Sequence, residues 1–324
     1  MSPSPHGLLS GLLLLALTVG VLTAADGTVA TAVYANVGHG YRREKGKDGA
    51  FKPEYYALSN GGRIYGTTRD LTVDRVTYPE VAEIAVRLLA QENYHYAQSK
   101  DQATLLLVLQ WGNTIGFDRT TYGLSVDAAA SAYAELVAAM GPQGPGRGFA
   151  GSQTTNPDGS PLNVGAGDPG ADDGFETAML RLLMDNRVRD QLNERNAKVL
   201  GYMDDLADAN DIRRWAGGGD RYTDLIGDVE ESRYYIVVSA YDFPELLKHD
   251  NKKLLWQTRV SVRTPGNRFD DSFAAMLKGA ARYFGQDSGR LIRGEESKGV
   301  VELGDLKFLG EAKEPGKKPA EEKK

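Results

Sequence analysis

The sequence contains no cysteine among its 324 residues. A chain without cysteine has no disulfide framework, no thiolate zinc site, no cysteine nucleophile and no cysteine to carry a lipid. The formal net charge of −6 excludes a chain that binds nucleic acid over its whole surface. A hydrophobic content of 41% excludes wholesale disorder. We therefore expect a globular protein that depends on its core for stability.

Charged residues are also missing from the first 25 positions. Residues 8–17 are mostly leucine, and small residues follow up to Ala25. An apolar segment followed by small residues is typical of a secretory signal peptide. The alternative is an uncleaved anchor, because residues 8–25 are 18 uncharged residues, close to the shortest membrane span. The pattern favours a secreted protein, periplasmic or extracellular, with no transmembrane span after cleavage.

The first part of the mature chain predicts two strands and a helix. Residues 28–37 are β-branched and small, which favours a strand. Thr77 and Glu80 fit a capping box, and apolar residues at helical spacing follow, so we expect a helix at 79–92. The apolar run at 103–109 predicts a strand buried on both sides.

The middle of the chain, residues 113–228, differs in composition. It contains an alanine-rich helix near 125–140 and then a stretch at 141–174 rich in Gly, Pro, Asn and Asp. That stretch predicts a flexible loop. The apolar positions in 175–215 keep no strict seven-residue repeat, which predicts one bent helix or two helices.

The last part predicts a β-hairpin and a helix. Residues 234–241 form one strand, and after a polar turn at 248–252 residues 254–263 alternate between apolar and polar. A single apolar stripe along 270–284 predicts a helix that covers the face of the β-hairpin carrying Trp256.

The fold class is therefore α+β: a small, mostly antiparallel sheet with helices packed on one face, interrupted by a long helical insertion. A further short strand is expected near 306–309. The expected boundaries are a signal peptide at 1–25, a first half-domain at 26–112, the insertion at 113–228, a second half-domain at 229–310 and a disordered tail at 311–324.

Two short motifs carry a resemblance to a known family. Lys-Leu-Leu-Trp at 253–256 lies on the second strand of the β-hairpin, and Tyr-Phe-Gly at 283–285 ends the following helix. Over residues 60–112 and 232–285 the chain resembles bacterial envelope domains of the domain-of-unknown-function 4136 type. Members are often lipoproteins, from which a chain without cysteine departs. The resemblance implies a fold and a location in the envelope, and no mechanism.

The sequence predicts no catalytic, cofactor-binding or metal-binding residues. Residues 165–170 match G-x-G-x-x-G by letter, but no strand precedes them. Asp204, Asp208 and Asp211 share a helical face, which favours a solvated acidic surface over a cation site. The chain has no G-x-S-x-G nucleophile motif. His95 and His249 are expected to be exposed or half-packed.

Basic residues are the best binding candidates. The loop at 40–52 holds Arg42, Arg43, Lys45 and Lys47, and the polar face of strand 254–263 holds Arg259 and Arg263. These cations suit an anionic envelope polymer or a lipid headgroup. The alternative is a solvated loop.

The function that these patterns favour is that of a non-catalytic protein of the cell envelope that binds or assembles with another envelope protein or with an anionic polymer. The alternatives are an exported hydrolase that uses carboxylates and a carrier of a small ligand. An enzyme predicts a concave site where polar groups converge. A binding module predicts an exposed apolar or tyrosine-rich patch along the insertion, and a carrier predicts a closed apolar cavity. The oligomeric state is left open.

Overall fold

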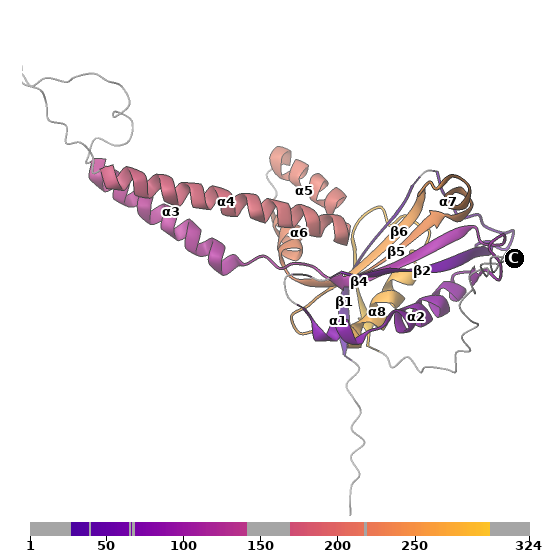
Figure 1. Ribbon diagram of the computed structural model, residues 1–324. Coiled ribbons are helices and arrows are strands. Elements are labelled where there is room, and N and C mark those ends of the chain that lie inside the picture. Colours follow the sequence, from indigo (N-terminus) through magenta and orange to yellow (C-terminus); the bar gives the residue numbers. More distant parts are fainter. Residues whose placement is uncertain are drawn as a thin grey trace, which may run out of the picture.

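The computed structural model describes residues 27–298, except 39, 65, 67–68, 141–168 and 217–218. These residues form an α+β fold in which a long helical hairpin projects from a sheet covered by helices (Figure 1). The expected signal peptide, the strand near 306–309 and the tail lie outside the described residues. None of the described helices is long and apolar enough to cross a membrane.

The sheet has seven strands in the order β3-β2-β4-β5-β6-β1-β7, so it is larger than expected. β2 runs parallel to β3 and β4, and the other neighbours are antiparallel. The strands are β1 (Thr28–Val37), β2 (Glu54–Ile64), β3 (Tyr94–Tyr96), β4 (Leu105–Asn113), β5 (Arg233–Asp242), β6 (Leu254–Arg263) and β7 (Ile292–Ser297).

Three helices cover one face of the sheet: α1 (Leu71–Arg75), α2 (Tyr78–Gln91) and α8 (Phe269–Ala281). The capping box that starts α2 is present. The stripe of α8 and the turn after it lie against β6, where the rings of Phe284 and Trp256 stack with centroids 5.8 Å apart. The predicted packing of this helix on the β-hairpin is confirmed.

The expectation that β4 is buried on both sides is wrong. Leu105, Leu107 and Leu109 are buried in the main core, whereas Leu106 and Val108 are half-buried on the opposite face. Helices cover that opposite face only in part, so these two side chains keep contact with solvent.

The insertion consists of α3 (Arg119–Met140), α4 (Pro169–Leu200), α5 (Met203–Ala216) and α6 (Asp220–Glu230). The end of α4 together with α5 and α6 forms a second apolar cluster with β1 and β5, so the insertion covers part of the other face. Residues 175–215 form two helices, as one of the two alternatives predicted. They separate at Gly201, whose φ of 81° is in the left-handed region that favours glycine.

Two connections differ from expectation. Residues 169–174, predicted as part of a loop, belong to α4; the rest of that predicted loop, 141–168, lies outside the described residues. The strands of the β-hairpin are joined through α7 (Phe243–His249), which ends inside the predicted polar turn. Asp242 caps α7 by accepting a hydrogen bond from the Glu245 amide at 3.1 Å, a local signal that favours a helix here.

Candidate functional site

The basic loop after β1 lines a hollow, here called the basic hollow, together with the turn that follows α8. Arg42, Lys45 and Lys47 are exposed, and none of them has an ion-pair partner among the described residues. Glu44 pairs instead with Lys52, whose Nζ lies 2.6 Å from Oε2. Arg42 and Lys45 therefore bring unpaired positive charge to the basic hollow, whose lining also includes Asp287, whereas Lys47 lies in the same loop outside that lining.

Arg43 is buried, unlike the other three candidate residues of the loop. It is 5% exposed, and its guanidinium carbon lies 4.1 Å from the ring centroids of both Phe51 and Tyr94. Its Nη2 donates to the carbonyl of Glu92 at 2.5 Å. Cation–π contacts and this hydrogen bond hold Arg43 within the wall of the hollow, away from its rim.

A polar network lies beside Arg43. Tyr41 Oη donates to Glu54 Oε2 at 2.7 Å and lies 3.4 Å from Tyr94 Oη. Burial raises the pKa of Glu54, although the Tyr41 hydrogen bond and the charge of Arg43 oppose that shift. Gly285 closes over this network with a φ of 67°, and a Cβ there would lie 2.1 Å from Tyr94 Oη.

The two arginines of β6 do not join the basic hollow. Arg259 donates to Asn36 Oδ1 at 3.1 Å, and burial lowers its pKa. Arg263 pairs with Glu231. Trp256 pairs with Val37 just before the basic loop, and Arg263 lies seven residues further along β6, about 23 Å away at about 3.3 Å per residue. The structure therefore separates the six candidates into three places: the basic loop, the middle of β6 at Arg259, and the far end of β6 at Arg263.

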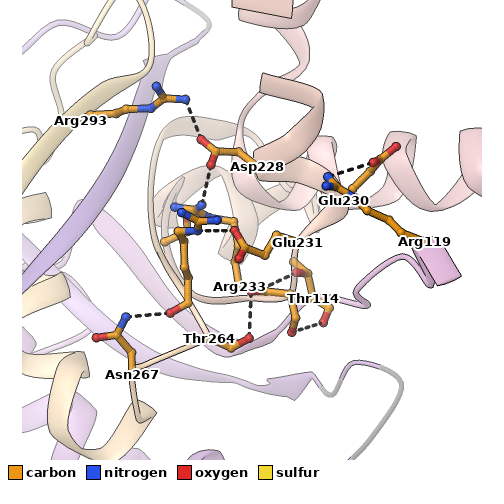
Figure 2. Close-up of polar contacts among 12 residues, drawn as sticks. Thr114, Arg119, Asp228, Glu230, Glu231, Arg233, Thr264, Asn267 and Arg293 are labelled. Carbon is orange, nitrogen blue, oxygen red and sulfur yellow. Dashed lines mark hydrogen bonds and ion pairs between the residues drawn. The ribbon is translucent and has the colours of Figure 1, made fainter. Parts of the chain in front are cut away.

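Arg263 belongs to a second hollow, here called the junction hollow, where α3 and α6 meet the sheet. Arg293 Nη2 lies 2.7 Å from Asp228 Oδ2, and the buried Arg233 places Nη1 3.2 Å from Oδ1 of the same carboxylate (Figure 2). Arg233 Nε also donates to Ser261 Oγ at 3.1 Å. The arginines of this hollow are therefore paired with carboxylates, whereas Asp118 and Asp224 of its lining have no ion pair among the described residues.

Glu230 connects the junction hollow to both helices of the hairpin. It is 4% exposed, its Oε1 accepts from Arg189 Nε of α4 at 2.5 Å, and its Oε2 lies 3.3 Å from Arg119 Nη2 of α3. Asn193 Nδ2 donates to Oε1 at 3.2 Å. Because each of these groups has a protein partner, the junction hollow anchors the hairpin to the sheet.

The acidic and histidine candidates show no catalytic grouping. In the part of the chain that the structure describes, no three His, Asp or Glu residues are placed to hold a metal ion. Asp204 accepts a hydrogen bond from Tyr34, and the neighbouring Asp205 is buried and accepts one from the Leu291 amide at 2.7 Å. His249 is exposed and lies 3.1 Å from Glu245.

The third candidate site is the α3/α4 hairpin. Small residues on α3 allow the two helices to pack closely, since Ala129 is 5% exposed. Tyr122 Oη donates to Asn186 Oδ1 at 2.6 Å, and Ser125 Oγ donates to Asp185 Oδ2 at 2.5 Å. These contacts fix the register of the antiparallel pair.

The hairpin exposes an unusual amount of apolar surface. Figure 1 shows that most of its length extends beyond the sheet and its other helices. The exposed large apolar side chains are Leu124 (66%), Val126 (39%) and Tyr133 (50%) on α3, and Leu180 (54%), Leu183 (56%), Met184 (67%) and Val188 (53%) on α4. The sequence pattern predicts apolar positions here, but only the structure shows that no other described helix covers them.

Comparison of the sequence with protein-family models and with curated proteins found no match.

Proposed function

We propose that this chain is an exported, non-catalytic protein that binds or assembles with other components of the cell envelope through the α3/α4 hairpin. The observation that carries the proposal is the exposed apolar surface along the hairpin. An apolar patch on the insertion is the feature that separates a binding module from an enzyme and from a carrier. Export remains part of the proposal because it depends on the composition of residues 1–25.

The size of the exposed surface supports binding. The exposed fractions of the seven side chains are together equivalent to nearly four complete side chains. Leu124 and Val126 point about 200° apart around α3, so one partner cannot cover all seven. The exposed fractions of the four side chains on α4 are equivalent to about 2.3 complete side chains. Burial of a large apolar side chain contributes about 1.5–3 kcal/mol, so covering these four would contribute roughly 3–7 kcal/mol before the cost of association. That contribution favours binding of a partner of complementary shape.

Four carboxylates in or beside the two hollows are engaged by protein partners, whereas Asp118, Asp224 and Asp287 line the hollows without an ion pair among the described residues. Asp228, Glu230 and Glu231 are paired with arginines, and Glu54 is hydrogen-bonded to Tyr41. The two hollows are open to solvent and carry many polar side chains, unlike the closed apolar cavity of a carrier. These observations favour the binding proposal over both alternatives.

The proposal is tested by affinity isolation with crosslinking from native envelopes, comparing the wild-type chain with the double variant Leu183→Glu, Met184→Glu. We expect the crosslinked partner to be lost from the variant, because two carboxylates would be buried at the interface. The matched control is Leu71→Glu, Leu247→Glu, since these residues are 67% and 56% exposed but lie on α1 and α7. Equal recovery of the partner with both double variants would contradict the proposal.

A second candidate function rests on the exposed cations of the basic loop, which suit an anionic polymer. Titration with polyphosphate at two salt concentrations tests it. We expect the triple variant Arg42→Ala, Lys45→Ala, Lys47→Ala to lose most of the binding and most of its salt dependence. The variant Lys248→Ala, Lys252→Ala, which removes exposed cations near α7, should bind as the wild type does. Loss of binding in both would indicate non-specific attraction.

A further inference from the structure

The outward face of α4 carries a stripe in which residues at equal distances from the centre are matched: apolar with apolar, polar with polar, and acidic with basic. The stripe has steps of four, three, four, four, three and four residues along the helix. At about 100° per residue these positions share one face, and every one of them is exposed. Met184 is the centre, flanked at four, seven and eleven residues by Leu180 and Val188, Thr177 and Gln191, and Asp173 and Arg195.

We infer that two copies of the chain associate through this stripe, with their α4 helices antiparallel and a two-fold axis at Met184. The inference rests on the proposed function for the choice of surface alone: it names a second copy of the chain as an occupant of the exposed apolar face of the hairpin. Leu180 of one copy then meets Val188 of the other, and Thr177 meets Gln191. The two α3/α4 hairpins together form a four-helix arrangement that buries the central apolar side chains.

The charges at the two ends of the stripe favour the antiparallel direction, whereas the exposed Arg181 and Arg187 flank its centre in both copies and oppose association in either direction. In the antiparallel direction Asp173 of each copy lies opposite Arg195 of the other, which gives an ion pair at both ends of the interface. A parallel arrangement would place Asp173 against Asp173 and Arg195 against Arg195. Neither residue has an ion-pair partner among the described residues, so both charges are available.

The order of polarity along the stripe supports the same arrangement. Its middle is apolar, with Leu180, Met184 and Val188 each more than half exposed, and its ends are polar and charged. An apolar centre with a polar rim is the usual composition of a protein interface. The six steps of the stripe average about 3.67 residues, the spacing of an eleven-residue repeat, and this value is so close to the 3.6 residues per helical turn that the stripe stays on one face of a nearly straight helix.

The absence of cysteine makes a direct test possible. A single cysteine from Met184→Cys lies on the two-fold axis, so mild oxidation should link two copies into a disulfide dimer on a non-reducing gel. Leu180→Cys alone should link poorly, but an equimolar mixture with Val188→Cys should link well. The matched control is Asp190→Cys, an exposed position of α4 away from the stripe. Crosslinking of Met184→Cys no better than the control would overturn the proposal.

Charge exchange tests the direction of pairing in the full chain without a crosslink. By multi-angle light scattering and sedimentation, Asp173→Arg or Arg195→Asp alone should weaken the dimer about tenfold, since each reverses two ion pairs of surface strength. The double variant Asp173→Arg, Arg195→Asp should restore it to within about twofold. Failure of the double variant to restore the dimer, or a wild-type chain that stays monomeric at all concentrations, would refute the inference.

The two proposals fail in different ways. If the wild-type chain is monomeric but its hairpin still captures another envelope protein, self-association is refuted and the proposed function stands. If the chain forms the antiparallel dimer but captures no other envelope component, self-association stands and the proposed binding to other components fails.

Discussion

Replacement of Glu230 by glutamine should release part of the connection between the α3/α4 hairpin and the sheet. Glutamine keeps the volume of the side chain but removes the negative charge that faces Arg189 and Arg119. The carboxylate is 4% exposed, so water does not replace the lost interaction. Both arginines then keep a positive charge beside an uncharged, buried amide.

The magnitude follows from the three contacts. A hydrogen bond to a charged group contributes about 1.5–3 kcal/mol, and the Arg189 contact at 2.5 Å belongs to this class. Arg119 is 65% exposed, so its ion pair contributes no more than about 1 kcal/mol. Asn193 can still donate to the amide oxygen. We therefore expect Glu230→Gln to lower the free energy of unfolding by about 2–3 kcal/mol.

The neighbouring residue provides the control. Glu231→Gln removes the same charge one position along, but its partner Arg263 is 59% exposed, so the expected loss is no more than about 1 kcal/mol. Urea unfolding measures both variants, and an unchanged slope shows that the unfolded state is the same. In Glu230→Gln, backbone amides at the end of α4 should also exchange hydrogen faster, because the helix is held less firmly to the sheet. If both variants lost the same free energy of unfolding, the reasoning would be refuted, because the burial of Glu230 would then not strengthen its ion pairs.

The remaining predictions concern the core beside the basic hollow. Gly285→Ala should lower the melting temperature more than Gly49→Ala in thermal unfolding. Both residues have positive φ, a conformation that costs alanine about 1–2 kcal/mol. Only at Gly285 would the added Cβ also collide with Tyr94. Equal decreases in melting temperature for the two variants would contradict this prediction. Because burial raises the pKa of Glu54, its contribution to stability is present below the ordinary carboxyl value of 4.5 and is lost as the pH rises through the raised folded-state pKa. Glu54→Gln should remove this decline from a pH profile of stability, and superimposable profiles would contradict it.

Elements whose signals lie in neighbouring residues were predictable from the sequence. The capping box of Thr77 and Glu80 starts α2 where expected, and the alternation of β6 and the stripe of α8 predict the faces that meet in the core. Gly201 divides two helices that the apolar spacing allowed as one of two alternatives. Caps, turns and periodicity act over a few residues, so they can be recognised without tertiary structure.

Elements defined by distant partners were not predictable in the same way. β7 has a polar sequence, and it is a strand because it pairs with β1, some 260 residues earlier in the chain. β2 gains its place from pairing with β4, with a bulge between Asn60 and Gly62. Neither strand has an alternating pattern strong enough to be recognised alone, because backbone pairing across the sheet stabilises them.

The candidate sites, too, were predictable from the sequence only in part. The sequence by itself determined that the chain lacks cysteine, that its cations cluster in the loop at 40–52, and that the insertion is helical with apolar positions along it. Only the tertiary structure decided that Arg43 is enclosed between two rings while Arg42 stays accessible, and that the apolar face of α4 has no covering element among the described residues. The physical reason is that periodicity assigns residues to a face of a helix or strand, whereas burial depends on whether a distant segment packs on that face.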